Sequence, residues 1–133
     1  MKENSIKPYC YCGESESSLV DNAIFVYFGD EYRRVLLDEI LWLEASGSYC
    51  VLCMENGAEI TVSYALDRIF NNDLPRGKFQ RIHRSYAINV FKVTGFAGNY
   101  VHIGKKMLPV SESHKKNFLA CFHKIYSKRA LGK

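Results

Sequence analysis

The chain has 133 residues, 47% of them hydrophobic and 14% aromatic, which suffices for the core of one domain and excludes a main body that stays disordered. No apolar run reaches the roughly 18 residues of a membrane span, and no apolar stretch follows the first lysine, which excludes a signal peptide and predicts a cytoplasmic protein. Residues 1–75 carry 5 Lys/Arg against 13 Asp/Glu, a net −8, whereas residues 76–133 carry 13 Lys/Arg against the single acid Glu112, a net +12. Such a basic half repels itself unless a polyanion or solvent takes up the field, which indicates nucleic acid as the partner.

A polar leader precedes the part of the chain that we expect to fold. Residues 1–22 contain Pro8, Gly13 and a Ser-rich stretch, which is typical of a flexible leader or the remnant of a linker. We expect the folded domain over residues 23–127, followed by a basic tail at residues 128–133.

Short strands dominate the folded part. Apolar runs separated by turn residues predict strands at 24–28, 32–37, 41–44, 49–54, 58–62, 79–82, 86–89, 93–97, 100–103 and 107–110. Asn56-Gly57 is a strong hairpin signal and joins two of these runs. About ten mostly antiparallel strands without β-α-β alternation predict a mainly β fold of packed sheets with two helices.

Two segments have helical periodicity. The first helix is expected to use Ser63 as its N-cap, to bury Leu66, Ile69 and Phe70, and to end at residues 71–73. The second is expected to begin near Ser111 or Ser113. Its apolar stripe comprises Phe118, Leu119, Phe122, Ile125 and Tyr126.

The five cysteines are an odd number, which argues against a complete disulfide framework. Cys50 and Cys53 lie three apart on a predicted strand and should face opposite sides of the sheet, so we interpret both as core cysteines. Cys10 and Cys12 are expected to be free thiols in the leader, and Cys121 to serve packing in the second helix.

No residue set indicates catalysis, a metal or a cofactor. His83 stands beside Ser85, but neighbours two apart on a strand point the same way, and Glu112 is the only acid nearby in sequence to orient a histidine. The four histidines fall on different predicted elements, and no G-x-G-x-x-G joins a strand to a helix. We therefore predict a protein that is not an enzyme and that carries neither a metal nor a cofactor.

The basic residues also admit a simple surface interpretation. Arg81 and Arg84 could be solvated side chains, and Lys115-Lys116 fit the solvated face of an ordinary helix. The concentration of cations in one half with almost no acids favours binding, but by itself it does not separate DNA from RNA or from an acidic protein surface.

Three stretches resemble the LytTR DNA-binding domain family. Residues 79–89, Phe-Gln-Arg-Ile-His-Arg-Ser-Tyr-Ala-Ile-Asn, are similar to its F-x-R-x-H-R-S-Y-x-x-N core. Residues 40–49 resemble its I-x-x-I-E-A…Y segment, and residues 108–118 resemble its closing P-V-S-x-S…F stretch. The resemblance implies a bacterial transcription regulator that binds duplex DNA through loops entering successive major grooves, with an elongated set of antiparallel sheets.

The resemblance also implies site residues in three loops. The first loop spans Ser46 to Tyr49, the second His83 to Ser85 with Arg84 suited to a guanine, and the third leads from residues 111–113 into Lys115 and Lys116. The expected DNA-binding set is Ser46, Ser48, Tyr49, Arg81, His83, Arg84, Ser85, Ser113, Lys115 and Lys116. Within it Ser48, Arg81, Ser85 and the two lysines would contact the backbone. His83 has an alternative role as a structural residue that orients the Arg84 loop.

Two departures from the family leave alternatives open. Many members carry a basic residue where Glu112 stands, so Glu112 either reads a cytosine or only stabilises a helix start. Members are commonly fused to a receiver domain of two-component response regulators, for which residues 1–22 are too short. The chain could therefore be a stand-alone regulator, a piece of a longer one, or an interaction module that binds another regulator. Two copies could bind as a homodimer or side by side on repeated sites.

Overall fold

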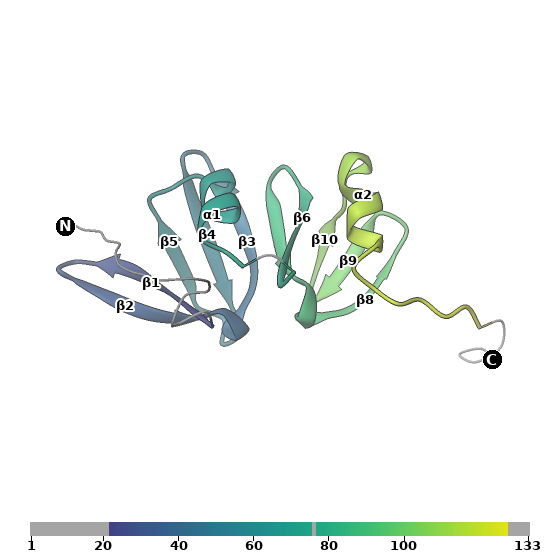
Figure 1. The fold of residues 1–133 in the computed structure, drawn as a ribbon, viewed down its shortest axis with the longest axis horizontal. Helices are drawn as coiled ribbons and strands as arrows, with labels where there is room; N and C mark the ends of the chain where they lie inside the picture. Colours follow the sequence, from purple (N-terminus) through teal and green to yellow (C-terminus); the bar gives the residue numbers. More distant parts are fainter. Residues whose placement is uncertain (1–21, 76, 128–133) are drawn as a thin grey trace, which may run out of the picture.

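The computed structural model describes residues 22–75 and 77–127, and this part forms an elongated row of antiparallel sheets (Figure 1). Its strands are β1 (Ala23–Phe28), β2 (Glu31–Leu36), β3 (Ile40–Ser46), β4 (Tyr49–Met54), β5 (Glu59–Val62), β6 (Phe79–His83), β7 (Tyr86–Asn89), β8 (Val93–Ala97), β9 (Tyr100–Ile103) and β10 (Lys106–Pro109). Its helices are α1 (Leu66–Asn72) and α2 (Glu112–Leu119). Ten strands in three antiparallel sheets with two α-helices confirm the predicted mainly β fold.

The central sheet has five strands in the order β5-β4-β3-β7-β6. The hairpin predicted at Asn56-Gly57 is present: the Ala58 N–H donates to Asn56 Oδ1 over 2.9 Å, and Gly57 adopts φ 91°, a left-handed conformation that favours glycine. Strands β1 and β2 form a separate two-stranded sheet, and β10-β9-β8 form a three-stranded one.

The two faces of the central sheet bury different cores. One core contains Leu43, Cys50 and Leu52 and is covered by α1 and the β1–β2 hairpin. The other contains Trp42 and Cys53 and is covered by the three-stranded sheet and Phe118 of α2, among others. The alternation of side chains along a strand produces this division.

Cys50 and Cys53 confirm the prediction made for them. Both thiols are buried, and they belong to the two different cores. Burial raises the pKa of Cys50 to about 11 and that of Cys53 to about 12, so both stay protonated at neutral pH.

The second helix is shorter than its periodicity predicts. It ends at Leu119, and Ile125 and Tyr126 are 94% and 86% exposed. Phe118 and Phe122 already cover the ring of Phe96, at centroid distances of 5.2 and 5.1 Å. Ile125 and Tyr126 belong to neither of the two cores of the described residues, and an apolar stripe that is not buried contributes little to the stability of a helix.

Two smaller predictions about the helices are also wrong. Cys121 is exposed and lies after the end of α2, so it does not serve helix packing. Helix α1 starts two residues later than a Ser63 cap would give, because its N-cap is Ala65, which makes no side-chain cap hydrogen bond. The chain must first cross from β5 to the place where Leu66 and Ile69 become buried.

Predictions for the chain ends lie outside the described residues. These include the leader with Cys10 and Cys12 and the basic tail at residues 128–133. The domain boundaries therefore stay a prediction. Within the described part, no helix has the length and apolar character needed to cross a membrane.

Candidate nucleic-acid interface

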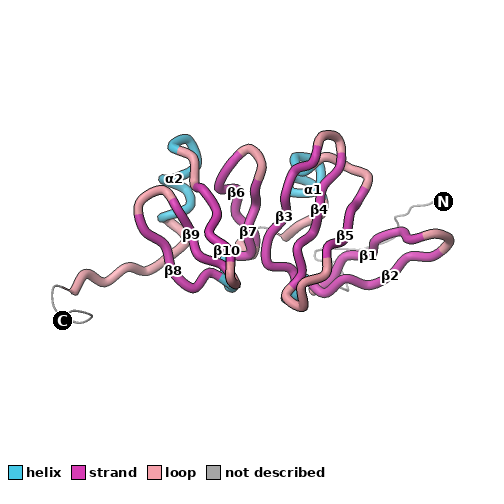
Figure 2. Tube along the Cα trace, turned by 180° about the vertical axis from the view of Figure 1, so that it is seen from behind, coloured by secondary structure: helices cyan, strands magenta, loops and turns pink. Residues whose placement is uncertain are grey.

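Three turns meet along one edge of the molecule. The β3–β4 and β6–β7 turns lie at the same end of the central sheet because Glu44 pairs with Tyr86 and the Ala45 N–H donates to the Ser85 carbonyl over 2.8 Å. The start of α2 joins them through a 2.8 Å hydrogen bond from the Ser111 N–H to the Ile82 carbonyl. We call these turns, residues 46–49, 83–85 and 111–116, the loop edge; they lie along the upper side of the molecule in both views (Figures 1 and 2).

The first turn presents polar and aromatic groups to solvent. Ser46, Ser48 and Tyr49 are all exposed, and Tyr49 has half of its surface accessible. Gly47 adopts φ 62°, which a residue with a Cβ rarely does, so the tight turn depends on glycine at this position.

The second turn is organised by His83. Its Nδ1 accepts a 3.0 Å hydrogen bond from the Ser85 N–H, and its ring lies 5.6 Å from that of Tyr86. A neutral imidazole that accepts at Nδ1 carries its proton on Nε2, which leaves one donor for an outside group. The hydrogen bond to Ser85 supports the structural role considered for His83, and it is compatible with a DNA contact from Nε2.

Arg84 and Arg81 of this segment behave differently. Arg84 is exposed, and its side chain has no hydrogen bond or ion pair with residues 22–75 or 77–127. The Arg81 side chain is only 16% exposed and is turned toward the protein. Its Nε donates to the His83 carbonyl over 3.0 Å, and its terminal nitrogens donate to the Arg84 carbonyl and to the Asp67 carboxylate. The structure thus separates two arginines that the sequence places in one set.

The third turn leads into α2. Ser111 is the N-cap residue, and its Oγ lies 2.8 Å from His114 Nδ1. Ser113 and Lys116 are exposed, while half-buried Lys115 donates to Asn99 Oδ1 over 3.0 Å. Partial burial, and then the charges of Arg81 and His83, lower the pKa of His114, so it adds no charge at neutral pH.

Some cations of the basic half are neutralised away from this edge. Lys78 pairs with Asp38 at 2.7 Å, and Lys92 pairs with Glu55 at 3.0 Å. The Lys78 ammonium lowers the pKa of the Asp38 carboxyl through its hydrogen bond and its charge. The loop edge keeps Arg84, Lys115 and Lys116, so the net charge of the whole half overstates what is available for binding.

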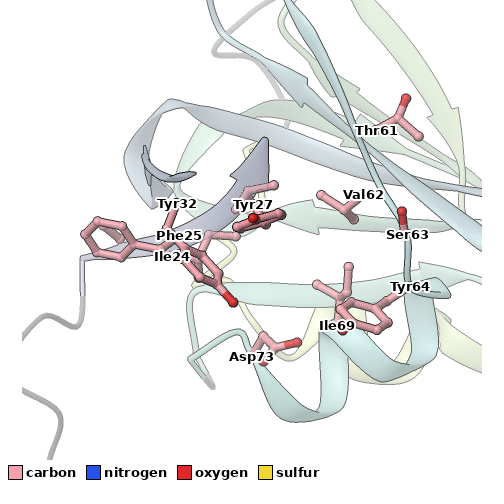
Figure 3. A pocket seen from close by; sticks show the side chains of 12 residues that line it. Ile24, Phe25, Tyr27, Tyr32, Thr61, Val62, Ser63, Tyr64, Ile69 and Asp73 are labelled. Atoms are coloured by element: carbon pink, nitrogen blue, oxygen red, sulfur yellow. The ribbon is translucent and has the colours of Figure 1, made fainter. Parts of the chain in front are cut away.

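Two hollows lie in the described part of the chain. A hollow of about 540 Å³ lies between β1, β5 and α1, with Tyr27, Tyr64 and Asp73 on its walls, and shares no residue with the loop edge (Figure 3). A second, of about 450 Å³, reaches from Phe70 of α1 to Arg81 and His114. In the described ranges, no three His, Cys, Asp or Glu side chains are grouped as metal ligands would be.

Two residues at this edge are absent from the set predicted from sequence. Asp67 binds Arg81, and Asn99 binds Lys115. They lie 14 and 16 residues away from their partners, on other elements, and no motif marks them. Only the fold brings these groups together.

Comparison with known proteins finds a matching family and similar solved structures. The family described as the LytTr DNA-binding domain matches residues 30–123. A solved structure, the LytTr DNA-binding domain of a protein described as a methyl-accepting/DNA response regulator from Bacillus cereus, is 22% identical and superposes with a TM-score of 0.64. The match covers 75% of this chain and 95% of that chain. No curated protein matches the chain.

Proposed function

This chain belongs to the LytTr DNA-binding domain family, and from that premise we propose that it is a bacterial transcription regulator that binds a specific duplex DNA sequence through its loop edge. The observation that carries the proposal is the row of three turns with exposed Arg84 on the middle one, whose side chain has no partner among the described residues. Turns of this size can enter a major groove without a recognition helix. Successive turns would then meet successive grooves on one side of the duplex.

Base reading is assigned to the first and second turns. The Arg84 guanidinium presents paired donors that match O6 and N7 of a guanine. His83 can donate from Nε2, and Tyr49 and Ser46 offer groups from the neighbouring turn. These side chains are exposed or half-buried and need no rearrangement of the core to reach a base edge.

Backbone contacts are assigned to short polar and long basic side chains around them. Ser48, Ser85 and Ser113 can donate to phosphate oxygens, while Lys115 and Lys116 supply charge beside the start of α2. Such contacts fix the position of the protein on the duplex and do not read sequence.

A selection of bound sequences from a random duplex library tests the proposal. Enrichment of one repeated motif by the wild-type chain supports sequence-specific DNA binding. The rival function, an interaction module that binds another regulator, is favoured by the exposed acid Glu112 within the loop edge. A folded protein that enriches no sequence would support that rival.

Salt dependence measures the charge contribution. With Arg84, Lys115 and Lys116 near phosphates, log affinity should fall linearly with log salt, with a slope of about −3. Lys116→Ala should weaken binding to all duplexes alike and make the slope shallower by about 0.9. Lys105→Ala is a matched control, because Lys105 is exposed in the β9–β10 turn, whose Gly104 lies beside Leu41 at the opposite end of the central sheet. Equal slopes for the wild type and Lys116→Ala would remove Lys116 from the contact set.

Glu112 should act on the helix and not on base preference. It is the first residue of α2, where a carboxylate is stabilised by the N-terminal end of the helix dipole. Glu112→Gln should lower the free energy of unfolding by on the order of 0.5 kcal/mol and leave the selected DNA motif unchanged. Urea unfolding and library selection measure the two effects. A shifted motif with unchanged stability would instead assign base reading to this carboxylate.

A further inference from the structure

The β6–β7 turn is tied to helix α1 by one side chain. Arg81 donates to the carbonyls of His83 and Arg84 on one side and to the Asp67 carboxylate on the other. Asp67 is the second residue of α1, and that helix is anchored by the buried Leu66 and Ile69. The connection therefore runs from a fixed core element to the turn that carries Arg84.

The turn needs such a connection because its strand pairing is irregular. The β6–β7 register shifts between Arg81 and His83, so the ladder is irregular just before the turn and resumes only at the last pair, His83 and Tyr86. Arg81 donates to the carbonyls of His83 and Arg84, which lie on the turn side of this irregularity. A planar guanidinium can reach acceptors in two directions at once, which an ammonium on a flexible stem does less well.

We propose that Asp67 is a positioning residue for DNA recognition, which acts by holding Arg81 so that Arg81 fixes the backbone of the β6–β7 turn and the direction of Arg84. The inference rests on the proposed function of the loop edge. It also gives Arg81 a role inside the protein in place of the phosphate contact that the family resemblance implies. Asp67 itself is 76% exposed, and in this proposal it acts through Arg81 and not through a contact of its own with DNA.

The sign of the effect distinguishes positioning from simple charge. Asp67 is an acid close to a surface that binds a polyanion, so its removal should strengthen binding if charge alone mattered. Positioning predicts the opposite sign on the preferred sequence. On unrelated duplexes, where Arg84 reads no base, binding should stay equal or become tighter.

Asp67→Asn should weaken binding to the preferred sequence by about two- to fivefold, the range expected for an exposed ion pair. Asp73→Asn is the matched control: it removes the same charge at the other end of the same helix, where Asp73 faces the hollow and not the turn (Figure 3). It should cause no loss. Asp67→Glu, which keeps a carboxylate, should retain most of the affinity. If Asp67→Asn, like Asp73→Asn, caused no loss on the preferred duplex, the positioning role would be wrong.

Arg81→Lys gives a second, independent measurement. It should lower affinity for the preferred sequence by about tenfold while the salt slope stays at its wild-type value, because the positive charge is kept and no phosphate contact is lost. Added to Arg81→Lys, Asp67→Asn should cause no further loss, since the two residues act as one unit. A shallower slope with equal loss on unrelated DNA would make Arg81 a phosphate contact after all.

Hydrogen exchange in the DNA-free protein separates failure of this inference from failure of the proposed function. Asp67→Asn should speed exchange of the Ala45 and Ser85 amides, which bond within and beside the turn, while the Ile69 amide of α1 keeps its protection. Faster exchange with no sequence selection by the wild type would overturn the DNA-binding proposal but would still support the positioning of the turn by Asp67 and Arg81. Unchanged exchange would overturn the positioning role of Asp67, whatever the result of the DNA selection.

Discussion

Asn89→Ala should lower the free energy of unfolding by about 2–4 kcal/mol, although the residue lies at the end of the central sheet opposite the loop edge. Asn89 has no exposed surface. Its Nδ2 donates to the carbonyls of Leu37 and Ile40 over 3.3 and 3.0 Å, and its Oδ1 accepts from the Phe91 N–H over 3.0 Å. Alanine would leave these three backbone groups without their partner in a buried site, and each such loss is costly.

Urea unfolding of the wild type and two variants measures this effect. Asn72→Ala is the control, because Asn72 is exposed at the end of α1 and should change stability by less than about 0.5 kcal/mol. An equally small change for Asn89→Ala would mean that water replaces all three hydrogen bonds. The predicted loss would instead explain why β7, after the buried Ala87 and Ile88, ends on a buried asparagine.

Local signals were sufficient for the strands. Side-chain alternation and turn residues such as Asn56-Gly57 are signals that depend on only a few neighbouring residues. The structure has a strand at each predicted place. The opposite orientations of Cys50 and Cys53 followed from the same period of two. Helix ends were less predictable, because Ile125 and Tyr126 continue a helical period beyond the surface that α2 can cover.

Contacts between distant segments were beyond local reasoning. The family resemblance indicated the three turns, but nothing in the sequence joins Asp67 to Arg81 or Lys78 to Asp38. These pairs are 14 and 40 residues apart and depend on how α1 and the 3-10 turn at Leu37–Glu39 pack. They decide which cations face outward, so the count of basic residues indicated a basic half, while the fold shows which of its individual side chains are exposed and which are paired.

Arg84→Ala should cost about 1–3 kcal/mol on the preferred duplex and relax the preference at one base position. The reason is geometric: Arg84 is the exposed cation of the middle turn, its side chain has no partner within the described ranges, and the turn beneath it is held by His83 and Arg81. A guanidinium fixed in this way can make two parallel hydrogen bonds to one guanine. Lys105→Ala removes an exposed positive charge at the other end of the central sheet and should leave both affinity and preference nearly unchanged.

Arg84→Lys separates base reading from charge. A lysine keeps the charge but has no paired, planar donors, so binding to unrelated duplexes should stay near wild type while the preference at that base position is lost. Affinities for the selected motif and for single-base variants of it, measured at fixed salt, give the answer. If Arg84→Lys retained the full preference, or if Arg84→Ala weakened all duplexes equally, Arg84 would be a phosphate contact. The sequence-reading role would then pass to His83 and to the turn that carries Tyr49.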